Sequence, residues 1–386
     1  MAKRGLIVVA GSLAQKPGHG GHTWVFLQYL LGFRRLGWDV LFLDELSPAM
    51  CVDGHGSVCP LRESVNLRYF LKVMKQFGFA GAFSLNHNCG EVVVGLSRQE
   101  VLERVGRAAF LLNVMGYLSD PDVLARAPRR IFLDIDPGFP QMWRELGLCD
   151  LFWGHDALVT IGENIGRENC DIPTCGMEWI RTPQPVVLDS WPVVEPNSGA
   201  FSSVASWRGV FGPLTYQGKT YGLRVHEFRK FVELPRRTGR PFKLALDIHP
   251  AEAKDLALLA ENGWCLVDPA TAGDPWQYQA FIQDSAAEFM VAKNMYVATN
   301  SGWFSDRSIC YLASGRPVLA QDTDIKHLYP NGEGLVIFST VQEAATGVEA
   351  INCDYARHAR AARAIAEEYF DSDKVLTRLL ADLGVG

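Results

Sequence analysis

The sequence lacks the features that mark several classes of protein. Its nine cysteines include no Cys-x-x-Cys pair and no other zinc-type spacing, so we expect no bound metal. No stretch reaches the roughly 20 apolar residues that span a bilayer, so we expect no transmembrane segment, while peripheral membrane contact stays open. An odd number of scattered thiols is typical of a reducing compartment. These absences together predict a cytoplasmic protein.

An excess of positive charge is also missing. The formal net charge is −6, which gives no basic footprint and argues against nucleic acid as a main partner. There are no internal repeats and no low-complexity tracts. With 386 residues, 48% of them hydrophobic, the chain exceeds one ordinary core and predicts two globular domains.

The first half alternates between strand and helix patterns. An apolar strand at Leu6–Ala10 leads through the glycine-bearing turn Gly11–Gly21 into an apolar helix at Thr23–Leu36, and a second strand follows at Asp39–Asp44. Such alternation predicts a parallel sheet covered on both faces. Further elements are expected as helices at Ser64–Phe77, Arg98–Val105, Gln141–Leu146 and from Ala157, and as strands at Phe110–Met115, Arg130–Ile135 and Leu148–Trp153.

Four prolines interrupt this alternation between Arg181 and Asn197. Proline removes a backbone donor and prevents both helix and central strand, so we place a hinge at 183–198, between domains at 1–182 and 199–386. The second domain is expected to hold strands at Trp207–Phe211, Phe242–Leu246 and Trp264–Val267, and helices at Leu223–Leu234, Ala251–Glu261, Trp276–Gln283 and within Tyr355–Leu383. The predicted fold class is α/β, with two Rossmann-like βα domains facing a cleft.

The most informative segment is Thr299–Asp324. Ser305 is a good N-cap for a short helix, Gly315 supplies the left-handed residue that ends it, and a strand begins after Pro317. A turn that leads into a helix aims several free N–H groups and the positive end of the helix dipole at one spot, where a diphosphate can bind. Asp306 would repel such an anion, and Arg307 could offset the repulsion.

Ala313-Ser314-Gly315-Arg316-Pro317-Val318 resembles the donor-binding region of GT-B glycosyltransferases. The resemblance implies the GT-B architecture, in which an N-terminal domain binds the acceptor and a C-terminal domain binds a nucleotide sugar. One departure is clear. Retaining members carry a Glu-x7-Glu pair, and the matching positions here are Gly302 and Cys310, so the family's usual ribose contact is missing.

The resemblance also implies the residues that bind the donor. A lysine in the loop after the first strand of the second domain would approach the diphosphate, and Lys219 matches it. Trp303 could stack on a base or a sugar, and Asp322 matches an acid that contacts sugar hydroxyls. The full set expected to bind the nucleotide-diphosphate sugar, which serves as a co-substrate with no separate cofactor, is Lys219, Gly302, Trp303, Ser305, Arg307, Ser308, Asp322 and Thr323.

Catalytic candidates lie in the first half. In inverting family members a histidine where the first loop meets its helix deprotonates the acceptor, and His22, or less closely His19, matches that position. A histidine acts as a base near neutral pH if a carboxylate orients it. Asp136, at the end of the strand near 130–135, could orient a histidine or bind acceptor hydroxyls. Asp134 and Asp136 form a DxD string, but GT-B enzymes usually need no bound metal for catalysis.

These features predict a hexosyltransferase-like enzyme that moves a sugar from a nucleotide-diphosphate donor to a hydroxyl of a small molecule or glycan. His22 as the base favours inversion. Two alternatives stay open: a GT-B-fold sugar-nucleotide epimerase and a sensor that binds a nucleotide or sugar without turnover. A nicotinamide oxidoreductase fits least, because the first glycine-rich turn does not have the GxGxxG spacing.

Overall fold

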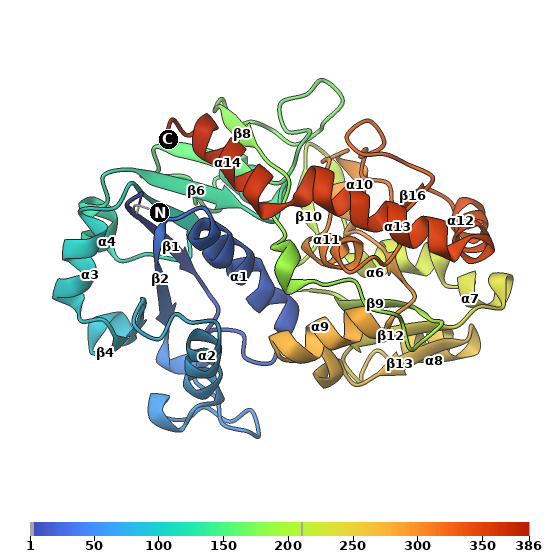
Figure 1. Cartoon of the computed structure of the whole chain (residues 1–386), viewed down its shortest axis with the longest axis horizontal. Helices are drawn as coiled ribbons and strands as arrows, with labels where there is room; N and C mark the ends of the chain where they lie inside the picture. The colour runs from blue at the N-terminus through green and yellow to red at the C-terminus, as the bar shows by residue number, and fades with distance from the viewer. Residues whose placement is uncertain (1–3, 210, 386) are drawn as a thin grey trace.

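The computed structural model describes residues 4–209 and 211–385, which form two mainly parallel sheets with helices on their faces (Figure 1). In the described residues the first sheet has the strand order β4-β3-β2-β1-β5-β6-β7-β8 and the second has β13-β12-β9-β14-β15-β16. Only β4 runs antiparallel to its neighbour within the described part of these sheets. In both sheets the order reverses beside the first strand, and ligands bind at the carboxyl ends of the strands at such a point.

The strands of the first sheet are β1 (Leu6–Gly11), β2 (Asp39–Leu46), β3 (Phe83–His87), β4 (Val92–Gly95), β5 (Phe110–Val114), β6 (Arg130–Asp134), β7 (Ala157–Thr160) and β8 (Trp179–Arg181). Those of the second are β9 (Phe201–Ser206), β12 (Phe242–Asp247), β13 (Trp264–Val267), β14 (Ala287–Met290), β15 (Val318–Gln321) and β16 (Leu335–Phe338). A separate hairpin is formed by β10 (Leu214–Tyr216) and β11 (Lys219–Tyr221).

The helices are α1 (Gly20–Arg35), α2 (Val65–Gln76), α3 (Arg98–Val105), α4 (Pro121–Arg126), α5 (Phe139–Glu145), α6 (Arg224–Phe228), α7 (Leu234–Thr238), α8 (Ala253–Glu261), α9 (Pro275–Asp284), α10 (Asn294–Ala298), α11 (Asp306–Ala313), α12 (Val341–Cys353), α13 (Tyr355–Ile365) and α14 (Ser372–Asp382).

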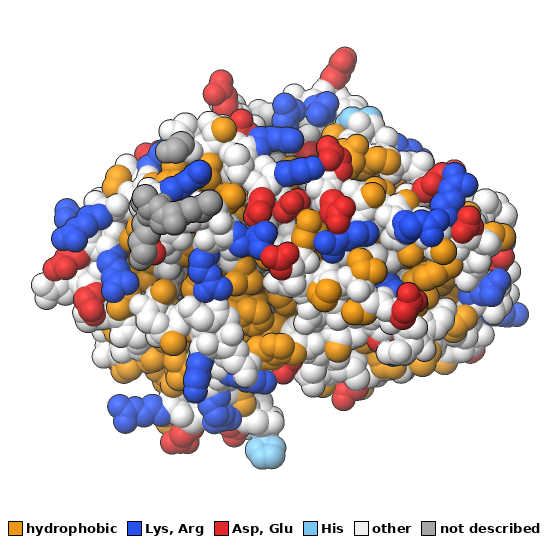
Figure 2. Space-filling model, viewed as in Figure 1, with side chains coloured by type: hydrophobic (Ala, Val, Ile, Leu, Met, Phe, Trp, Pro, Cys, Tyr) orange, Lys and Arg blue, Asp and Glu red, His pale blue; other side chains and the backbone are white. Residues whose placement is uncertain are grey.

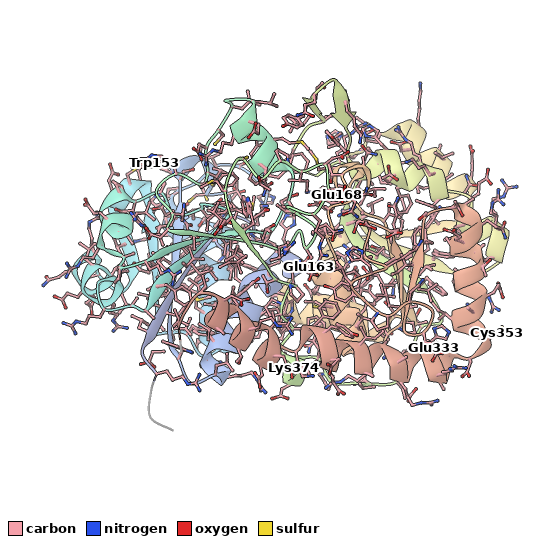
Figure 3. All side chains as sticks on the ribbon, turned by 90° about the horizontal axis from the view of Figure 1, so that it is seen from above. Trp153, Glu163, Glu168, Glu333, Cys353 and Lys374 are labelled. Atoms are coloured by element: carbon pink, nitrogen blue, oxygen red, sulfur yellow. The ribbon has the colours of Figure 1, made fainter. Side chains whose placement is uncertain are left out.

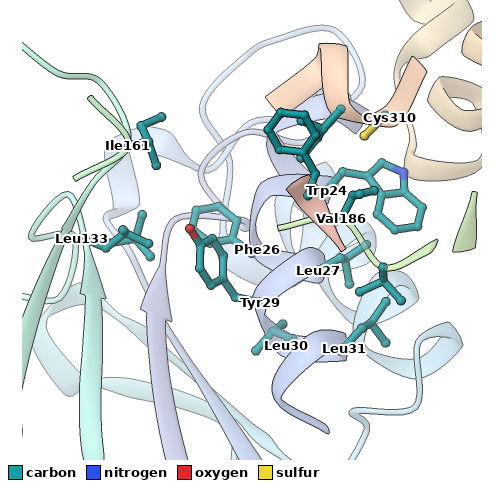
Figure 4. Packing of buried hydrophobic residues seen from close by; sticks show 14 of the residues in the cluster. Trp24, Phe26, Leu27, Tyr29, Leu30, Leu31, Leu133, Ile161, Val186 and Cys310 are labelled. Atoms are coloured by element: carbon teal, nitrogen blue, oxygen red, sulfur yellow. The ribbon is translucent and has the colours of Figure 1, made fainter. Parts of the chain in front are cut away.

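Helix α1 is buried on nearly all sides, as its apolar sequence requires. Figure 4 shows Phe26 and Tyr29 on the side of the first sheet, and Trp24 on the side of α11. The Trp24 indole donates to the carbonyl of Pro275 in α9 at 2.8 Å. Gly32 allows α14 to approach, since a Cβ there would lie 2.4 Å from Leu376 Cδ1. The hydrophobic core therefore continues from one half of the chain into the other.

The chain passes from the first sheet to the second between β8 and β9, which contains the proposed hinge at 183–198. Helix α14 lies within the proposed second domain but packs against α1 of the first, and Figure 1 shows it over that half. Arg35 of α1 also pairs with Asp373 of α14 at 3.0 Å.

Several expected elements are confirmed. Helix α3 has the predicted bounds, Ser305 caps α11 by accepting from the Arg307 N–H at 3.2 Å, and Gly315 adopts the left-handed conformation with φ 69°. The apolar segment at Trp264–Val267 is also a strand as predicted.

Other predictions were wrong. Leu148–Trp153 is not a strand but an exposed loop, with Trp153 84% exposed at the edge of the molecule (Figure 3). Ala157 begins strand β7 rather than a helix, because the short run ending in Val and Thr fills the next place in the sheet. The strand expected at Trp207–Phe211 lies earlier, as β9, and residue 210 is outside the described part. The helix expected over 223–234 is interrupted after Phe228 by 3₁₀ geometry.

Candidate functional site

A cleft separates the loop after β1 from the carboxyl ends of β9 and β12. It consists of two adjoining cavities of about 430 and 450 Å³ that share His19, His22, Ser206 and Asp247. The histidines come from the first half of the chain, and the other two residues end strands of the second sheet. The cleft thus lies where the order of strands reverses in both sheets, which is where this topology binds ligands.

Glycines let the first half approach the second at this point. A Cβ on Gly20 would lie 2.5 Å from the Asp274 carbonyl oxygen and 2.8 Å from that of Ala272. Any side chain would push the start of α1 away from the backbone before α9. The glycines of this loop therefore set the width of the cleft.

The N-terminus of α11 lies in the wall of the same cleft, through Asp306 and Arg307. The Arg307 guanidinium is 2.5 Å from Glu288 Oε1 and donates to the Val204 carbonyl at 2.8 Å. Its charge is therefore balanced by a fully buried carboxylate. Burial raises the pKa of Asp306, and the charge of Arg307 opposes that rise.

Two other cations line the cleft without a carboxylate partner. Arg224 donates to the carbonyls of Val291 at 3.1 Å and Ser206 at 3.2 Å, and it forms no ion pair with any residue that the structure describes. Burial, followed by the charge of Arg307, lowers its pKa to about 10, so it stays protonated at neutral pH. Lys16, whose pKa is lowered by burial, likewise has no ion pair within residues 4–209 and 211–385. Asp247 and Asp306 line the same cleft, but neither cation is held in an ion pair, so both are available to bind an anion.

The geometry of His22 differs from that of an activated base. Its Nε2 lies 3.1 Å from both the hydroxyl and the carbonyl oxygen of Ser12, and its ring packs edge-on against Phe26 at 5.0 Å. In the described residues no carboxylate bonds to it. Burial, followed by the charge of Lys16, lowers its pKa to about 3, so the ring is neutral at pH 7. His19 is exposed at the mouth of the cleft, and burial and Lys16 lower its pKa while Asp247 opposes the shift.

Asp136 holds the two halves together instead of orienting a histidine. Its Oδ2 lies 2.5 Å from Lys293 Nζ, and its Oδ1 accepts a short hydrogen bond from Tyr296, both residues of the second half. Asp134 is the last residue of β6 and is fully buried, accepting from Gln141 and Thr160 at 2.8 Å each. The DxD string is thus split between two environments because the strand ends at Asp134 and the chain turns before Asp136, whose N–H bonds to Asp134 Oδ1 at 3.0 Å.

The remaining residues expected to bind the donor lie outside the lining of the cleft. Lys219, on β11, is 3.1 Å from Asp171 Oδ2 and donates to the Ala298 carbonyl. Trp303 is buried and stacks on Tyr296, with ring centroids 4.4 Å apart. Asp322 pairs with Lys326 at 3.1 Å.

Three smaller residues of the predicted set are also internal. Gly302 donates its N–H to the carbonyl of Thr323 at 2.8 Å, and the Thr323 hydroxyl donates to the Trp303 carbonyl. Ser308 is fully buried in α11. Of the eight residues predicted for the donor, only Arg307 lines the cleft directly, while Ser305 acts on it as the cap of α11.

The structure shows what surrounds the two positions at which the sequence resemblance would place glutamates. A Cβ on Gly302 would lie 2.8 Å from Asn164 Cγ, in a left-handed backbone with φ +68°. Cys310 is buried against α1, where Gln28 Nε2 is 3.7 Å from its sulfur (Figure 4). Both positions are occupied by contacts between the two halves and leave no room for a carboxylate.

Sequence reasoning missed several residues of the cleft. Lys16 stands in the glycine-rich loop that was singled out, and its charge there was the available signal. Arg224 begins α6 after a loop, which gave no sign that its guanidinium would be left without a carboxylate. Ser206 and Asp247 end their strands at the cleft, and the misplacement of β9 hid the first of them.

No protein-family model matches the chain, and no curated protein matches its sequence. Solved structures do match. An alpha-glucosyltransferase in complex with UDP is similar at a TM-score of 0.61 and 10% identity, over 98% of this chain and 99% of that one. Sucrose-phosphate synthase from Thermosynechococcus elongatus has a TM-score of 0.55 and 12% identity, covering 99% of each chain.

AviGT4, a glycosyltransferase of avilamycin A biosynthesis, has a TM-score of 0.55 and 12% identity, over 98% of this chain and 96% of that one. These similarities together with the two sheets show that the chain has the GT-B fold, as the sequence indicated. At such low identity they define the architecture and leave the activity to the residues of the cleft. No helix in the described residues is long and apolar enough to cross a membrane.

Proposed function

We propose that the protein is a glycosyltransferase that uses a nucleotide-diphosphate sugar. The observation that carries the proposal is the pair of cations in the cleft, Arg224 and Lys16, that have no carboxylate partner in the described residues. Arg224 stands with the N-terminus of α11 and the glycine-rich start of α1 around one cavity, and Lys16 lines the adjoining cavity. Fixed charge and backbone N–H groups at a single spot stabilise a departing diphosphate.

The cleft supports a division of roles. Arg224 and Lys16 would bind the diphosphate and stabilise the charge that develops when the bond to the sugar breaks. Asp306 has a carboxylate beside the start of α11, so it would accept hydrogen bonds from hydroxyls of the ribose or the sugar rather than contact phosphate. The nucleobase of the donor would lie against Ala245 and Ala270, whose small side chains line the same cavity.

The neighbouring structures support the donor class. The alpha-glucosyltransferase was solved with UDP and also with UDP-glucose and DNA. For this chain we propose a donor of the same general kind and an acceptor other than nucleic acid. The net charge is −6, and Figure 2 shows positive and negative side chains interspersed over the face in view, without a broad basic patch.

His22 stays the proposed base for an inverting reaction, with His19 as the alternative. Its hydrogen bonds to Ser12 fix the ring, but its low pKa makes it a weak base at neutral pH. Asp136, which the sequence suggested could orient this histidine, would instead act by holding the two halves of the chain in position. Lys219, Trp303, Asp322 and Thr323 would affect the donor through the packing around α10 and β15.

Calorimetric titration with UDP, GDP, ADP and dTDP tests the donor site. We expect one nucleotide family to bind, and Arg224→Ala to weaken that binding at least about tenfold, the effect of losing one charge-assisted hydrogen bond or more. Arg240→Ala is the control, because this exposed arginine pairs only loosely with Glu349, at 3.8 Å. Equal loss in both variants, or no binding by any of the four, would contradict the proposal.

Product analysis separates the alternatives. A sugar-nucleotide epimerase converts the donor without an acceptor, a transferase releases nucleoside diphosphate only when an acceptor takes the sugar, and a sensor releases none. Slow release of nucleoside diphosphate without an added acceptor, with water taking the sugar, would also support the transferase.

A further inference from the structure

A second cavity, of about 420 Å³, lies in the first half at the ends of β2 and β3. Gln15 lines this cavity and the next residue, Lys16, lines the cleft. One loop therefore borders both spaces. A compound in the second cavity would lie beside the glycine-rich turn that faces the donor.

The charge of this cavity is opposite to that of the cleft. Its charged residues are three acids, Glu45, Asp120 and Asp122, and one base, Arg98. The guanidinium is fully engaged, with a short hydrogen bond to Asp120 and one of 2.6 Å to Asp122. It is therefore not free to receive a phosphate or carboxylate. The remaining negative charge disfavours an anion, and at short range like charges are repelled even at physiological salt.

Two oxygen atoms at this end of the sheet have no hydrogen-bond donor among the residues described. One is Asn86 Oδ1 and the other is Asp44 Oδ1, and both are buried. Asp44 is only 2% exposed, and its other oxygen accepts from the Ala14 N–H at 2.7 Å. A buried polar oxygen without a hydrogen-bond partner costs about 1–3 kcal/mol, so a native site normally supplies one. Burial raises the pKa of the Asp44 carboxyl well above its usual value, so Oδ1 can donate as well as accept.

The two unpartnered oxygens belong to neighbouring strands. Glu45 of β2 is in register with Asn86 of β3, and Asp44 is the residue before it. Asp44 and Asn86 both line a small side cavity of about 30 Å³, and Asn86 lines the large cavity as well. A space of that size holds roughly one water molecule or one hydroxyl group.

The rest of the large cavity has apolar surface. Tyr117, Leu46, Pro48 and Met50 lie in its lining, and Met50 is exposed to solvent there. Such side chains cover the C–H face of a sugar or cyclitol, while hydroxyls reach the polar groups at the edge. The cavity thus combines an apolar surface, unused hydrogen-bond acceptors and negative charge.

We propose that this cavity binds the sugar acceptor and that the acceptor is an uncharged polyhydroxyl compound, not a phosphorylated or carboxylated one. One hydroxyl donates to Asn86 Oδ1, and a hydroxyl or a water in the side cavity forms a hydrogen bond with Asp44 Oδ1. The inference rests on the proposed transferase function. In that reaction an acceptor oxygen bonds to the anomeric carbon, the bond from that carbon to the diphosphate breaks, and the hydroxyl proton is released, which gives a glycoside and a nucleoside diphosphate.

Matched pairs of ligands test the proposal on the full chain saturated with the nucleotide that binds best. Calorimetry would compare glucose with glucose 6-phosphate, and myo-inositol with its monophosphate. We expect at least one neutral compound to bind and its phosphate ester to bind at least tenfold more weakly. Glucosamine reports whether a positive charge is also accepted, and tighter binding of glucosamine than of glucose would identify an amino sugar within the same non-anionic class.

Two variants place the binding in this cavity. Asn86→Leu removes an unpartnered oxygen and should weaken the neutral ligand about tenfold while nucleotide binding is unchanged. Asp122→Lys reverses one charge and should reduce the difference in affinity between glucose and glucose 6-phosphate. Glu349→Lys, an exposed charge reversal far along the chain, is the control. It should change neither the affinity for the neutral ligand nor the difference in affinity between glucose and glucose 6-phosphate.

Equal or tighter binding of the phosphate esters would overturn the inference, and so would the absence of binding by every neutral compound. Both outcomes are distinct from failure of the proposed function. If nucleotides do not bind in the cleft, the transferase proposal falls whether or not a polyol binds in the second cavity.

Discussion

Asp136, two residues after β6, and Lys293, which follows β14, form an ion pair between the two halves of the chain, with 2.5 Å between Lys293 Nζ and Asp136 Oδ2. Their side chains are 17% and 18% exposed, so water screens the pair only in part. Tyr296 shares the carboxylate, and the ring of Phe139 lies 5.2 Å from the ammonium group. One acid of the first half thus binds two residues of the second, Lys293 and Tyr296.

Removal of one partner should therefore be costly. Asp136→Asn leaves Lys293 charged and largely buried, and we expect a loss of about 3 kcal/mol in the free energy of unfolding, measured with urea. Glu349→Gln breaks a more exposed pair and should cost less than about 1 kcal/mol. A smaller loss for Asp136→Asn than for the control would show that the contact between the halves does not depend on this pair.

Glutamate introduced at position 302 or 310, where retaining GT-B glycosyltransferases carry their pair, should damage this protein. In Gly302→Glu the new Cβ meets Asn164 in a left-handed backbone, and in Cys310→Glu a carboxylate is buried beside Gln28. We expect each to lower the free energy of unfolding by about 3 kcal/mol or more and to leave donor affinity no higher. Thermal unfolding and nucleotide titration measure both effects, and a stable variant with tighter nucleotide binding would contradict this explanation.

Lys219 and Arg224 should differ in their effect on the donor. Lys219 pairs with Asp171 away from the cleft, whereas Arg224 lines it. We expect Lys219→Ala to change the Kd for nucleotide less than about twofold, against at least about tenfold for Arg224→Ala. The Kd of each variant for nucleotide is measured side by side. A larger loss of affinity in Lys219→Ala than in Arg224→Ala would indicate that the diphosphate binds beside the β10–β11 hairpin.

His22 should make the protein less stable in mild acid. Its folded pKa of about 3 lies below the usual value of about 6.5, so the unfolded chain binds the proton first. The free energy of unfolding should fall as pH drops below about 6.5 and continue to fall toward about 3. His22→Gln should reduce this slope, and proton NMR should show a neutral ring in the native protein from pH 8 to 5. A native-state midpoint near 6.5 would refute the low pKa.

Glu163 should act in the opposite direction. Burial raises its pKa to about 7, and the phenol of Tyr329 from the second half donates to it, at the place where Figure 3 shows the two halves meeting. A raised carboxyl pKa contributes stability below the unfolded value near 4.5, and that contribution is lost as pH rises through about 7. Glu163→Gln should flatten the fall in Tm between pH 5 and 8. If Tm falls with pH as steeply in Glu163→Gln as in the unmodified protein, this residue is not the source of the fall.

Local sequence patterns predicted α11 well because the residues that form its cap, its apolar face and its C-terminal glycine all lie within Ser305–Pro317. The same patterns failed at Leu148–Trp153, which forms a loop in which Leu148 and Trp153 are exposed while Phe152 is buried. They also failed at Lys219, since the partner that draws it away, Asp171, is remote in sequence. The candidate site was predicted only as a region. The glycine loop and the start of α11 do border the same cleft, but the unpaired state of Arg224 depends on contacts that no local pattern contains.

The packing of α14 on α1 also bears on how the chain is made. Leu376 fills the space beside Gly32, and Asp373 neutralises Arg35, yet both come from residues that leave the ribosome long after α1. Until then the first sheet has formed with one side of its central helix uncovered. A nascent chain stalled before Ser372 should therefore expose apolar surface and bind chaperones, and the native state of the first half is completed only after α14 has been synthesised.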